Sequence, residues 1–542
     1  MSASRPSAAR KSWARPNLGI SDAFGALFSL AVASLSFLYP YGRDQSAFAY
    51  VAREWGLGNV PFKTVFEIKP PSIYLTYLCA FRIFGDHPSA IRLMDYFGAV
   101  VPTAIACAYA STPVREGPRP GRIGLALALV SVVYYLPFDF WSTAQCESFC
   151  SMFSVLAACA ALRSERSMRA GFFVGLWSTM AVLFKPTVAI VAIGNALVLA
   201  LALHSRKASR SDYLKASVAM VVGIVAPVVV LFAYFGAKGA LGPMHEALVV
   251  TNRQYLLAGR YVHGAEETSR AVLFGIFGFQ ALLILCGNVL VFRGAHVFRT
   301  RPREEALPYL AAGVGLLASV ASVIVQLKFF TYHWVSTVGF VAMTLVVVAG
   351  DLDRGRASRN RGAVLGAVVA LALLVTGGRQ SMRLFYTAKT AVHLAQTGDD
   401  EPLAKSFAIE SYYSDAGLSR EEILAQHKQT GDIDATTCKA YLDAGFLQAD
   451  KKTPITVTIG TIESKHHTSC YRLYNLWREA RAHKYVKGPA QAKLAPDWET
   501  LRKSAEVYSK APAPPSSDGG VDASPPTEAG PFDAGPFDAG RD

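Results

Sequence analysis

Long apolar runs recur along the first two thirds of the chain, and they restrict the fold more than any other feature. Eight runs of about 17 to 23 mostly apolar residues match the length that a helix needs to cross roughly 30 Å of hydrocarbon. Backbone groups in lipid must be paired internally, and the runs are too continuous for a transmembrane barrel, so helices are predicted. The runs lie near residues 19–40, 88–110, 144–162, 186–204, 214–236, 270–292, 307–327 and 334–350.

Three shorter runs, at 123–137, 170–184 and 363–377, are weaker candidates for membrane spans. The composition agrees with a membrane protein, because 52% of the residues are hydrophobic, only 17% are charged and the mean hydropathy is +0.27. An ordinary soluble globule is less apolar and carries more charge. The predicted fold class is an all-α polytopic membrane protein.

The basic residues gather in short clusters between the apolar runs. The net charge is +14, but this distribution follows the positive-inside pattern of cytoplasmic loops. No nucleic-acid partner is therefore expected. The clusters are Arg10, Lys11 and Arg15; Arg115, Arg119 and Arg122; Arg163, Arg166 and Arg169; Arg206, Lys207 and Arg210; Arg299, Arg301 and Arg303; and Arg354, Arg356, Arg359 and Arg361.

Placing every basic cluster in the cytoplasm gives one consistent topology of eleven spans, with the amino terminus inside and the carboxyl-terminal region outside. This topology requires that residues 72–84 do not cross the membrane, which their length of about thirteen residues and Arg82 already disfavour. Four polar segments then lie on the outer side, and the first is expected to hold juxtamembrane helices. These segments are 41–87, 138–143, 237–269 and 328–333.

The chain divides into four predicted parts. Residues 1–18 form a cytoplasmic leader and 19–377 the transmembrane domain. The first run could be a cleaved signal peptide, but it is longer than a typical cleavable core, which favours a retained span. Residues 378–510 are polar and mixed and are expected to form a small extracytoplasmic α/β region. Residues 511–542, rich in Pro, Ala, Gly and Asp, are predicted to be disordered.

Most of the eight cysteines fall in apolar runs, where they are expected to be small core residues. Cys438 and Cys470 lie in the predicted extracytoplasmic region, and their pairing stays open because the sequence does not fix their proximity. His466 and His467 lie near Cys470 but lack a second ligand pair, so no zinc site is predicted.

The segment from Tyr39 to Tyr77 holds the densest group of reactive polar residues in the chain. Apolar residues recur at helical spacing from Phe48 to Trp55, which predicts a short amphipathic helix lying along the membrane interface. Asp44 stands at the start of this helix, either as an N-cap or as a general base for an incoming hydroxyl or amine. Ionisable groups at this depth are usually functional.

Lys69 lies in the same segment, directly before Pro70 and Pro71. The prolines hold the lysine extended and are suited to opening a helix, so its ammonium should lie near a helix N-terminus. Both features attract phosphate, although a lysine that snorkels to the headgroups is the alternative. Glu54 and Glu67 are further substrate-binding candidates in this segment.

Two other outer segments repeat these residue types. Glu147, in STAQCESF, falls where a span begins, so it is either a functional carboxylate or a helix-start charge favoured by the dipole. Lys185, in FKP, repeats the lysine-proline arrangement at the outer end of another span. It is a second candidate for phosphate binding, with snorkelling again as the alternative.

The largest outer segment carries Arg253 and Tyr255, which suit phosphate and sugar but could equally be ordinary loop residues. The last one, KFFTYHW, presents Lys328 as a phosphate-binding candidate and His333 as a substrate-binding candidate. Its Tyr332 and Trp334 are expected in the aromatic belt at the membrane surface.

Four of these places together resemble the membrane glycosyltransferases of the GT-C superfamily, in the branch of protein mannosyltransferase-like and lipid A aminoarabinose transferase-like enzymes. The resemblance rests on DQSAFAYVAREW with FEIKPPSIYLTYLCAFRIFGDHPSAIRL, then CESF, FKPT and KFFTYHW. It covers roughly residues 20 to 350, and its first block is the most specific part. No close counterpart of residues 380–542 was found.

The resemblance implies that Asp44 acts as the base and that Lys69 contacts the phosphate of a polyprenyl-phosphate sugar. Many members have Asp-Glu where this chain has Asp44-Gln45, which puts metal binding by the second residue in doubt. In the aminoarabinose branch a glutamate directly precedes the lysine, whereas here Ile68 does and Glu67 lies one further back. A role for that glutamate therefore cannot be assumed.

The sequence as a whole predicts an inverting, multi-pass glycosyltransferase of the inner membrane. It would take a sugar from a polyprenyl-phosphate donor at the outer face and pass it to a lipid, glycan or protein acceptor, with membrane lipids around it. Lys69, supported by Lys185, Arg253 or Lys328, would bind the phosphate and stabilise the charge that develops as it leaves. The sequence identifies no cofactor and leaves the use of a divalent metal ion open. No nucleotide-binding motif indicates a soluble nucleotide-sugar donor.

A transporter or flippase of a lipid-linked saccharide is the alternative, and it would use the same basic groups only to bind its cargo. Charges in the middle of spans would favour it, but the spans are nearly free of them and the polar groups gather on one side. A third possibility is a membrane-anchored assembly protein that works through residues 378–510.

Overall fold

The computed structural model describes residues 16–38, 43–63, 67–112, 117–138, 142–163, 166–252 and 281–354, with isolated residues at 269, 272, 273, 389, 392, 396 and 397. Within these ranges the chain forms helices and no strand, which confirms the predicted all-α polytopic fold. The run 363–377, the region 378–510, the tail 511–542 and the pair Cys438 and Cys470 lie outside the described residues, so those interpretations stay predictions.

Nine helical stretches in the described ranges are long and apolar enough to cross a membrane, and each corresponds to a predicted run. Two short helices, α2 and α3, precede the second span, and two more helical segments, α11 and η4, follow α10. The bounds are α1 Ile20–Ser34 with η1 Leu35–Leu38; α2 Arg43–Gly56; α3 Ser72–Phe84; α4 Pro88–Asp95, η2 Tyr96–Val100 and α5 Val101–Ala110; α6 Arg122–Tyr135; α7 Cys146–Arg163; α8 Ser167–Phe184; η3 Pro186–Val188 and α9 Ala189–Ser205; α10 Arg210–Ala237; α11 Leu241–His245 and η4 Glu246–Thr251; α14 Ala281–Val289, η6 Leu290–Gly294 and α15 Ala295–Thr300; α16 Arg303–Ile324; η7 Thr331–Thr337 and α17 Val338–Arg354.

The predicted run 123–137 forms the shorter helix α6. Its 14 residues extend over about 21 Å, less than the thickness of the hydrocarbon. Nearly all of them are buried, because α6 is packed among α1, α5 and α17. This helix is therefore an internal element of the bundle and faces little lipid.

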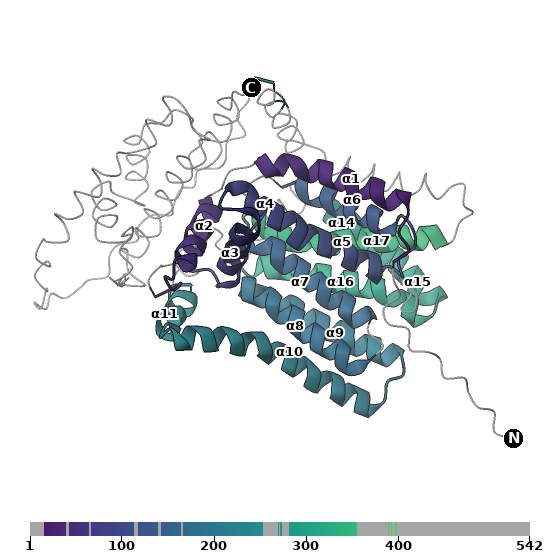
Figure 1. Cartoon of the computed structure of the whole chain (residues 1–542). Coiled ribbons are helices and arrows are strands. Elements are labelled where there is room, and N and C mark those ends of the chain that lie inside the picture. Colours follow the sequence, from purple (N-terminus) through teal and green to yellow (C-terminus); the bar gives the residue numbers. More distant parts are fainter. Residues whose placement is uncertain are drawn as a thin grey trace, which may run out of the picture.

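The long helices run side by side, and α2, α3 and α11 gather at one end of the bundle (Figure 1). We call this the site end, and it also holds the connections before α7, after α8 and after α16. The opposite end, the basic end, holds the connections that carry the Arg and Lys clusters of the described ranges. Two hydrogen bonds join separate segments at this end: Arg163 Nη1 donates to Thr112 O at 3.1 Å, and Asp22 accepts a bond of 2.7 Å from Gly121 N.

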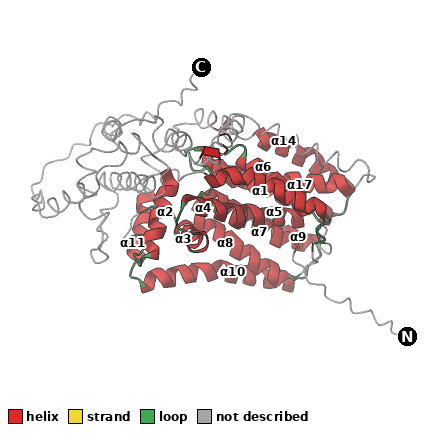
Figure 2. Cartoon of the chain, turned by 45° about the horizontal axis from the view of Figure 1, so that its top comes forward, coloured by secondary structure: helices red, strands yellow, loops and turns green. Residues whose placement is uncertain are grey.

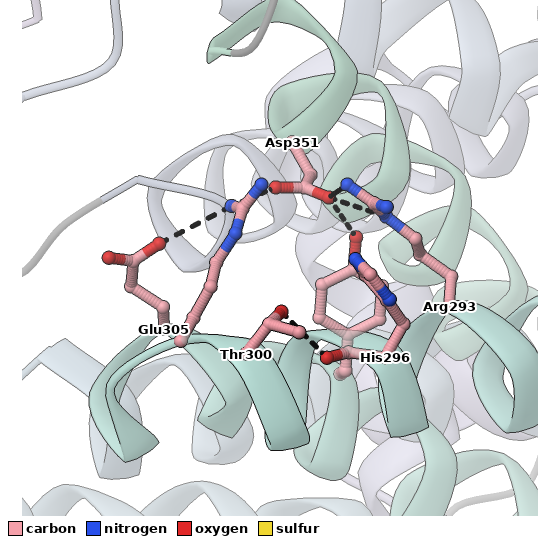
Figure 3. Close-up of polar contacts among 7 residues, drawn as sticks. Arg293, His296, Thr300, Glu305 and Asp351 are labelled. Carbon is pink, nitrogen blue, oxygen red and sulfur yellow. Dashed lines mark hydrogen bonds and ion pairs between the residues drawn. The ribbon is translucent and has the colours of Figure 1, made fainter.

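A buried acidic residue fixes the helices at the basic end (Figure 3). Asp351 of α17 is 1% exposed and accepts hydrogen bonds from Arg293 Nε at 2.8 Å, from Tyr309 Oη at 3.0 Å and from Arg301. These contacts explain why the helix predicted to end near residue 292 continues to Thr300. The guanidinium of Arg293 is partly exposed and is paired with Asp351, so its charge does not end the helix.

Glycines allow close approach between α8 and α10 (Figure 2 shows the two helices from a second direction). A Cβ atom on Gly175 of α8 would lie 2.2 Å from the carbonyl oxygen of Met220, and one on Gly223 of α10 would lie 2.2 Å from that of Phe172. Small residues permit this backbone contact in membranes, where helix association depends on packing.

The apolar face of α2 packs against protein, which differs from the interfacial position that the sequence suggested. Phe48 is 1% exposed, and its ring centroid lies 5.8 Å from that of Tyr77 in α3. At the far end of α2, Trp55 Nε1 donates to Tyr234 Oη of α10 at 2.5 Å. The face is hidden because α3 and α10 offer aromatic partners.

The short apolar helix α3 lies at the site end and does not run along the bundle (Figure 1). The predicted topology requires this, because residues 72–84 must not cross the membrane. It begins after the prolines that follow Lys69, and the turn after it carries Asp86, which forms an ion pair of 2.7 Å with Arg53 of α2. The chain before α3 and the turn after it therefore both lie at the site end.

Candidate active site

The backbone around Lys69 is held from two sides. The helix α3 begins at Ser72, directly after Pro70 and Pro71, as the sequence predicts. The hydroxyl of Tyr74 donates to the carbonyl oxygen of Lys69 at 3.0 Å. The side-chain amide of Asn252, which follows η4, donates to the carbonyl oxygen of Ile68 at 2.7 Å. The lysine thus lies at a fixed point before a helix N-terminus, where an anion is favoured.

Glu147 and Lys185 form a buried ion pair between two spans. Glu147 lies in the first turn of α7 and is 2% exposed, and Lys185 occupies the extended residue between α8 and η3. His333 Nε2 is 4.0 Å from the same carboxylate oxygen. The ammonium of Lys185 also lies 5.9 Å from the ring centroid of Tyr332. Residues from α7, α8 and η7 therefore meet at one place.

Lys328 enters this place from the connection between α16 and η7. It is 7% exposed, and its neighbours Leu327 (φ 51°) and Phe329 (φ 46°) both adopt the left-handed conformation. This conformation is uncommon for residues other than glycine and often marks a functional site. Burial, and secondarily the charge of Lys69, lower the pKa of Lys328 to about 7. The two ammonium groups are therefore near enough to repel each other, and a bound anion would relieve this.

The shared neighbour of the predicted base and the predicted phosphate ligand is Cys146, the first residue of α7. The charges of Asp44, Lys69, Lys185 and Glu147 all act on its thiol. Asp44 is half-buried in the first turn of α2, one residue inside the helix and past the N-cap position. The structure thus brings Asp44 and Lys69, which are separated by a helix and a loop, to the same region.

His333 is the shared neighbour of the three predicted lysines. It is 4% exposed, and the charges of Lys185, Lys69 and Lys328 all act on its imidazole. Three lysines therefore lie around one imidazole, and only Lys185 has its charge paired there, with Glu147. Such a region suits a phosphate group.

Two buried residues near Asp44, namely Arg92 and Thr143, were missed by the sequence interpretation. Arg92 of α4 donates from Nη2 to Gln45 Oε1 at 2.9 Å and from Nη1 to Thr143 Oγ1 at 2.8 Å. The side-chain nitrogen Nε2 of Gln45 donates in turn to the carbonyl oxygen of Thr143. The signal that could have found Arg92 is a cation inside an apolar run.

These contacts clarify the position of Gln45, which resembles the second residue of the family's Asp-Glu pair. Both ends of its side-chain amide are bonded to protein, and the residue is 0% exposed. It is therefore a poor ligand for a metal ion. Within the ranges that the structure describes, no group of three or more His, Cys, Asp or Glu side chains is arranged to hold a metal.

Glu54 and Glu67, the other predicted substrate-binding carboxylates of the first outer segment, lie at different distances from the predicted base and phosphate ligand. Glu54 accepts a bond of 2.5 Å from Asn59 Nδ2, and it stands ten residues after Asp44 in α2, about 15 Å along the helix axis. Glu67 is 1% exposed, and its Oε1 accepts from Ile68 N at 2.9 Å. The structure therefore does not bring Glu54 to Asp44, whereas Glu67 stays two residues before Lys69.

The remaining predictions concern the large outer segment and the aromatic residues. Arg253 and Tyr255 lie outside the described residues. Trp334 is 0% exposed, so its predicted place in the aromatic belt is wrong, because η7 directs it into the bundle. The ring centroid of Tyr332 lies 4.6 Å from that of His333, which makes Tyr332 a part of the site.

Residues 68–231 match a family model described as dolichyl-phosphate-mannose-protein mannosyltransferase. The crystal structure of ArnT from Cupriavidus metallidurans bound to undecaprenyl phosphate is similar over 86% of this chain and 88% of that chain, with 14% sequence identity and a TM-score of 0.41. No curated protein matches the chain. The matched segment includes Lys69, Glu147 and Lys185, and the family match confirms the predicted resemblance to the GT-C membrane glycosyltransferases.

Proposed function

We propose that this chain is an inverting glycosyltransferase that moves a sugar from a polyprenyl-phosphate donor to a lipid, glycan or protein acceptor. The observation that supports the proposal most is that Asp44 and Lys69 both lie near enough to the start of α7 for their charges to act on Cys146. Inverting transfer requires a base on one side of the anomeric carbon and stabilisation of the departing phosphate on the other. A carboxylate and a group of lysines in one region can supply both.

The transfer proceeds in one displacement. The acceptor oxygen or nitrogen gives its proton to the Asp44 carboxylate as it forms a bond to the anomeric carbon. The bond from that carbon to the phosphate oxygen breaks, and its electron pair stays on the phosphate. Lys69 and Lys328 stabilise this charge directly, whereas Lys185 shares its charge with Glu147. Arg253 is a further phosphate ligand on the basis of the resemblance.

The orientation follows from the distribution of charge. The described Arg and Lys clusters lie at the basic end, which is placed in the cytoplasm by the positive-inside rule. The site end then faces outward from the inner membrane. Exposed apolar side chains on the outermost helices, such as Ile20 on α1 (79% exposed) and Val230 on α10 (70% exposed), face lipid. The polyprenyl tail would lie in an apolar groove between spans.

The test is a panel of radiolabelled polyprenyl-phosphate sugars incubated with the purified protein, its Asp44→Asn variant and an Asp86→Asn control. The control makes the same chemical change in the same outer segment, at a carboxylate that is 53% exposed and paired with Arg53. We expect sugar release from at least one donor, a loss of about 100-fold in Asp44→Asn, and little change in Asp86→Asn.

Two results would contradict the proposal in different ways. If Asp44→Asn releases sugar as fast as the original protein, Asp44 is not the base, but the assignment as a glycosyltransferase stands. No release from any donor, together with movement of a labelled lipid-linked saccharide across proteoliposome membranes, would favour the flippase.

A further inference from the structure

Arg92 is a cation buried at the site end of the bundle without a direct place in the transfer reaction. It lies in the second turn of α4 and is 1% exposed. A charge at this depth is costly unless its hydrogen-bonding groups are paired. Its guanidinium donates to Gln45 Oε1 at 2.9 Å, to Thr143 Oγ1 at 2.8 Å and to Thr143 O at 3.2 Å.

These acceptors belong to two segments of the site, namely the start of α2 and the connection before α7. Gln45 directly follows Asp44 in the first turn of α2, so fixing its side chain fixes the helix start that presents Asp44. Thr143 lies in the connection that leads into α7 and to Glu147. The hydroxyl of Tyr77 donates to the next carbonyl, Ala144 O, at 2.8 Å. The guanidinium of Arg92 thus joins α2, α4 and the start of α7.

The positive charge of Arg92 also reaches the surroundings of Asp44. Both Arg92 and Asp44 act electrostatically on the hydroxyl of Tyr77. The guanidinium also acts on the buried carboxylate of Asp95, which lies one turn later on α4. Gln45 accepts its bond without adding a negative charge, whereas a glutamate at that position would neutralise the guanidinium. The other titratable and charged groups in these surroundings are Tyr77 on α3, Asp95 on α4, Tyr96 on η2, Tyr134 and Tyr135 on α6, Cys146 and Glu147 on α7, and the lysines Lys69 and Lys185.

We propose that Arg92 is a positioning residue for the transfer reaction. It holds the first turn of α2 through Gln45, and its charge keeps the neighbouring Asp44 in the ionised form that accepts a proton. This inference rests on the proposed function of Asp44 as the base.

The test compares Arg92→Gln, Arg92→Lys, Gln45→Leu and Asp44→Asn, using the polyprenyl-phosphate sugar that the unaltered protein cleaves. In Arg92→Gln we expect kcat to fall about 100-fold, the size of effect that misplacement of a reacting group produces. Loss of the positive charge should move the acidic limb of kcat/KM to higher pH. Because Arg92 does not touch the donor, KM and the binding of undecaprenyl phosphate should stay within about twofold of the original.

The conservative variants separate charge from geometry. Arg92→Lys keeps the charge, so it should return the acidic limb to its original pH. It should restore only part of kcat, because a lysine lacks the planar fork that bonds Thr143 through Nη1 and Gln45 through Nη2. Gln45→Leu keeps Arg92 and should lower kcat about tenfold without moving the limb. Circular dichroism and gel filtration show whether each variant folds. If Arg92→Gln does not fold, Arg92→Lys and Gln45→Leu still carry the test.

The outcomes distinguish this inference from the proposed function. If Asp44→Asn is inactive, the proposed function stands. In that case Arg92 is not a positioning residue if folded Arg92→Gln keeps the pH profile of the original protein, or if it loses donor binding while kcat is unchanged. The same holds if Arg92→Lys leaves the limb displaced, or if Gln45→Leu has full activity. If Asp44→Asn is active, or if the unaltered protein cleaves no donor, the proposed function fails and the inference fails with it.

Discussion

Glu147 at the start of α7 forms an ion pair with Lys185 at the end of α8, and the pair is almost entirely withdrawn from solvent. The Glu147 side chain is 3% exposed and that of Lys185 is 14% exposed. Both residues were predicted as candidates on separate grounds, one as a carboxylate at a span start and the other as a lysine before a proline. Their contact means that the site has a neutral pair beside the two lysines Lys69 and Lys328.

Removing one member of this pair should cost more than removing both. Lys185→Met leaves the Glu147 charge buried without its partner, and we expect it to lower the free energy of unfolding by about 3 kcal/mol. The double variant Glu147→Gln/Lys185→Met should recover most of this loss. Thermal unfolding in detergent of the two single variants and the double variant measures the coupling. Additive effects would show that the pair is not formed.

Lys328 should make phosphate binding depend on pH near neutrality. Its pKa is lowered to about 7, first by burial and then by the charge of Lys69. As the pH rises through this value the free protein loses a positive charge, so its affinity for undecaprenyl phosphate should fall. The phosphate itself gains negative charge above a pKa of about 6, which acts in the opposite direction.

A matched variant isolates the lysine. Lys328→Arg stays protonated at all pH values used, so the ratio of its affinity to that of the original protein should rise about tenfold from pH 6 to pH 8. Titrations with undecaprenyl phosphate in detergent provide the two binding curves. A ratio that does not change with pH would mean that Lys328 does not contact the phosphate.

The close contact of α8 with α10 should be sensitive to a single methyl group. In Gly175→Ala the new Cβ would lie 2.2 Å from the carbonyl oxygen of Met220, so the helices must move apart. We expect a loss of about 1 to 3 kcal/mol, typical of overpacking. The control is Gly287→Ala in α14, where a Cβ meets no atom within 4 Å. Thermal unfolding should show a lower midpoint for Gly175→Ala alone.

The sequence predicted those features that depend on local chemistry. The apolar runs identified the spans, and the prolines after Lys69 located the start of α3. The clusters of arginine predicted which connections share one end of the bundle. Each of these signals acts over one helix or one turn, so it can be recognised without knowing which helices are neighbours.

Features that depend on packing between distant segments could not be predicted in this way. The partner of Glu147 lies 38 residues away in sequence, and only the fold shows which of the outer lysines reaches it. The apolar face of α2 fits a membrane surface as well as it fits α3, so its aromatic contacts with Tyr77 and Tyr234 were not foreseen. Arg92 was detectable as a charge in an apolar run, but its acceptors on α2 and before α7 were not.

The orientation of the bundle can be tested with two single cysteines. Leu57, in the turn after α2, is 52% exposed at the site end, and Arg210, at the start of α10, is exposed at the basic end. In a Cys79→Ala background, which removes the exposed cysteine of the described ranges, a membrane-impermeant maleimide should label Leu57→Cys in spheroplasts and should label Arg210→Cys only after lysis. The background protein without either new cysteine controls for labelling elsewhere in the chain. Labelling of Arg210→Cys in intact spheroplasts would reverse the orientation, and Asp44 and Lys69 would then face the cytoplasm, where the positive-inside rule does not place them.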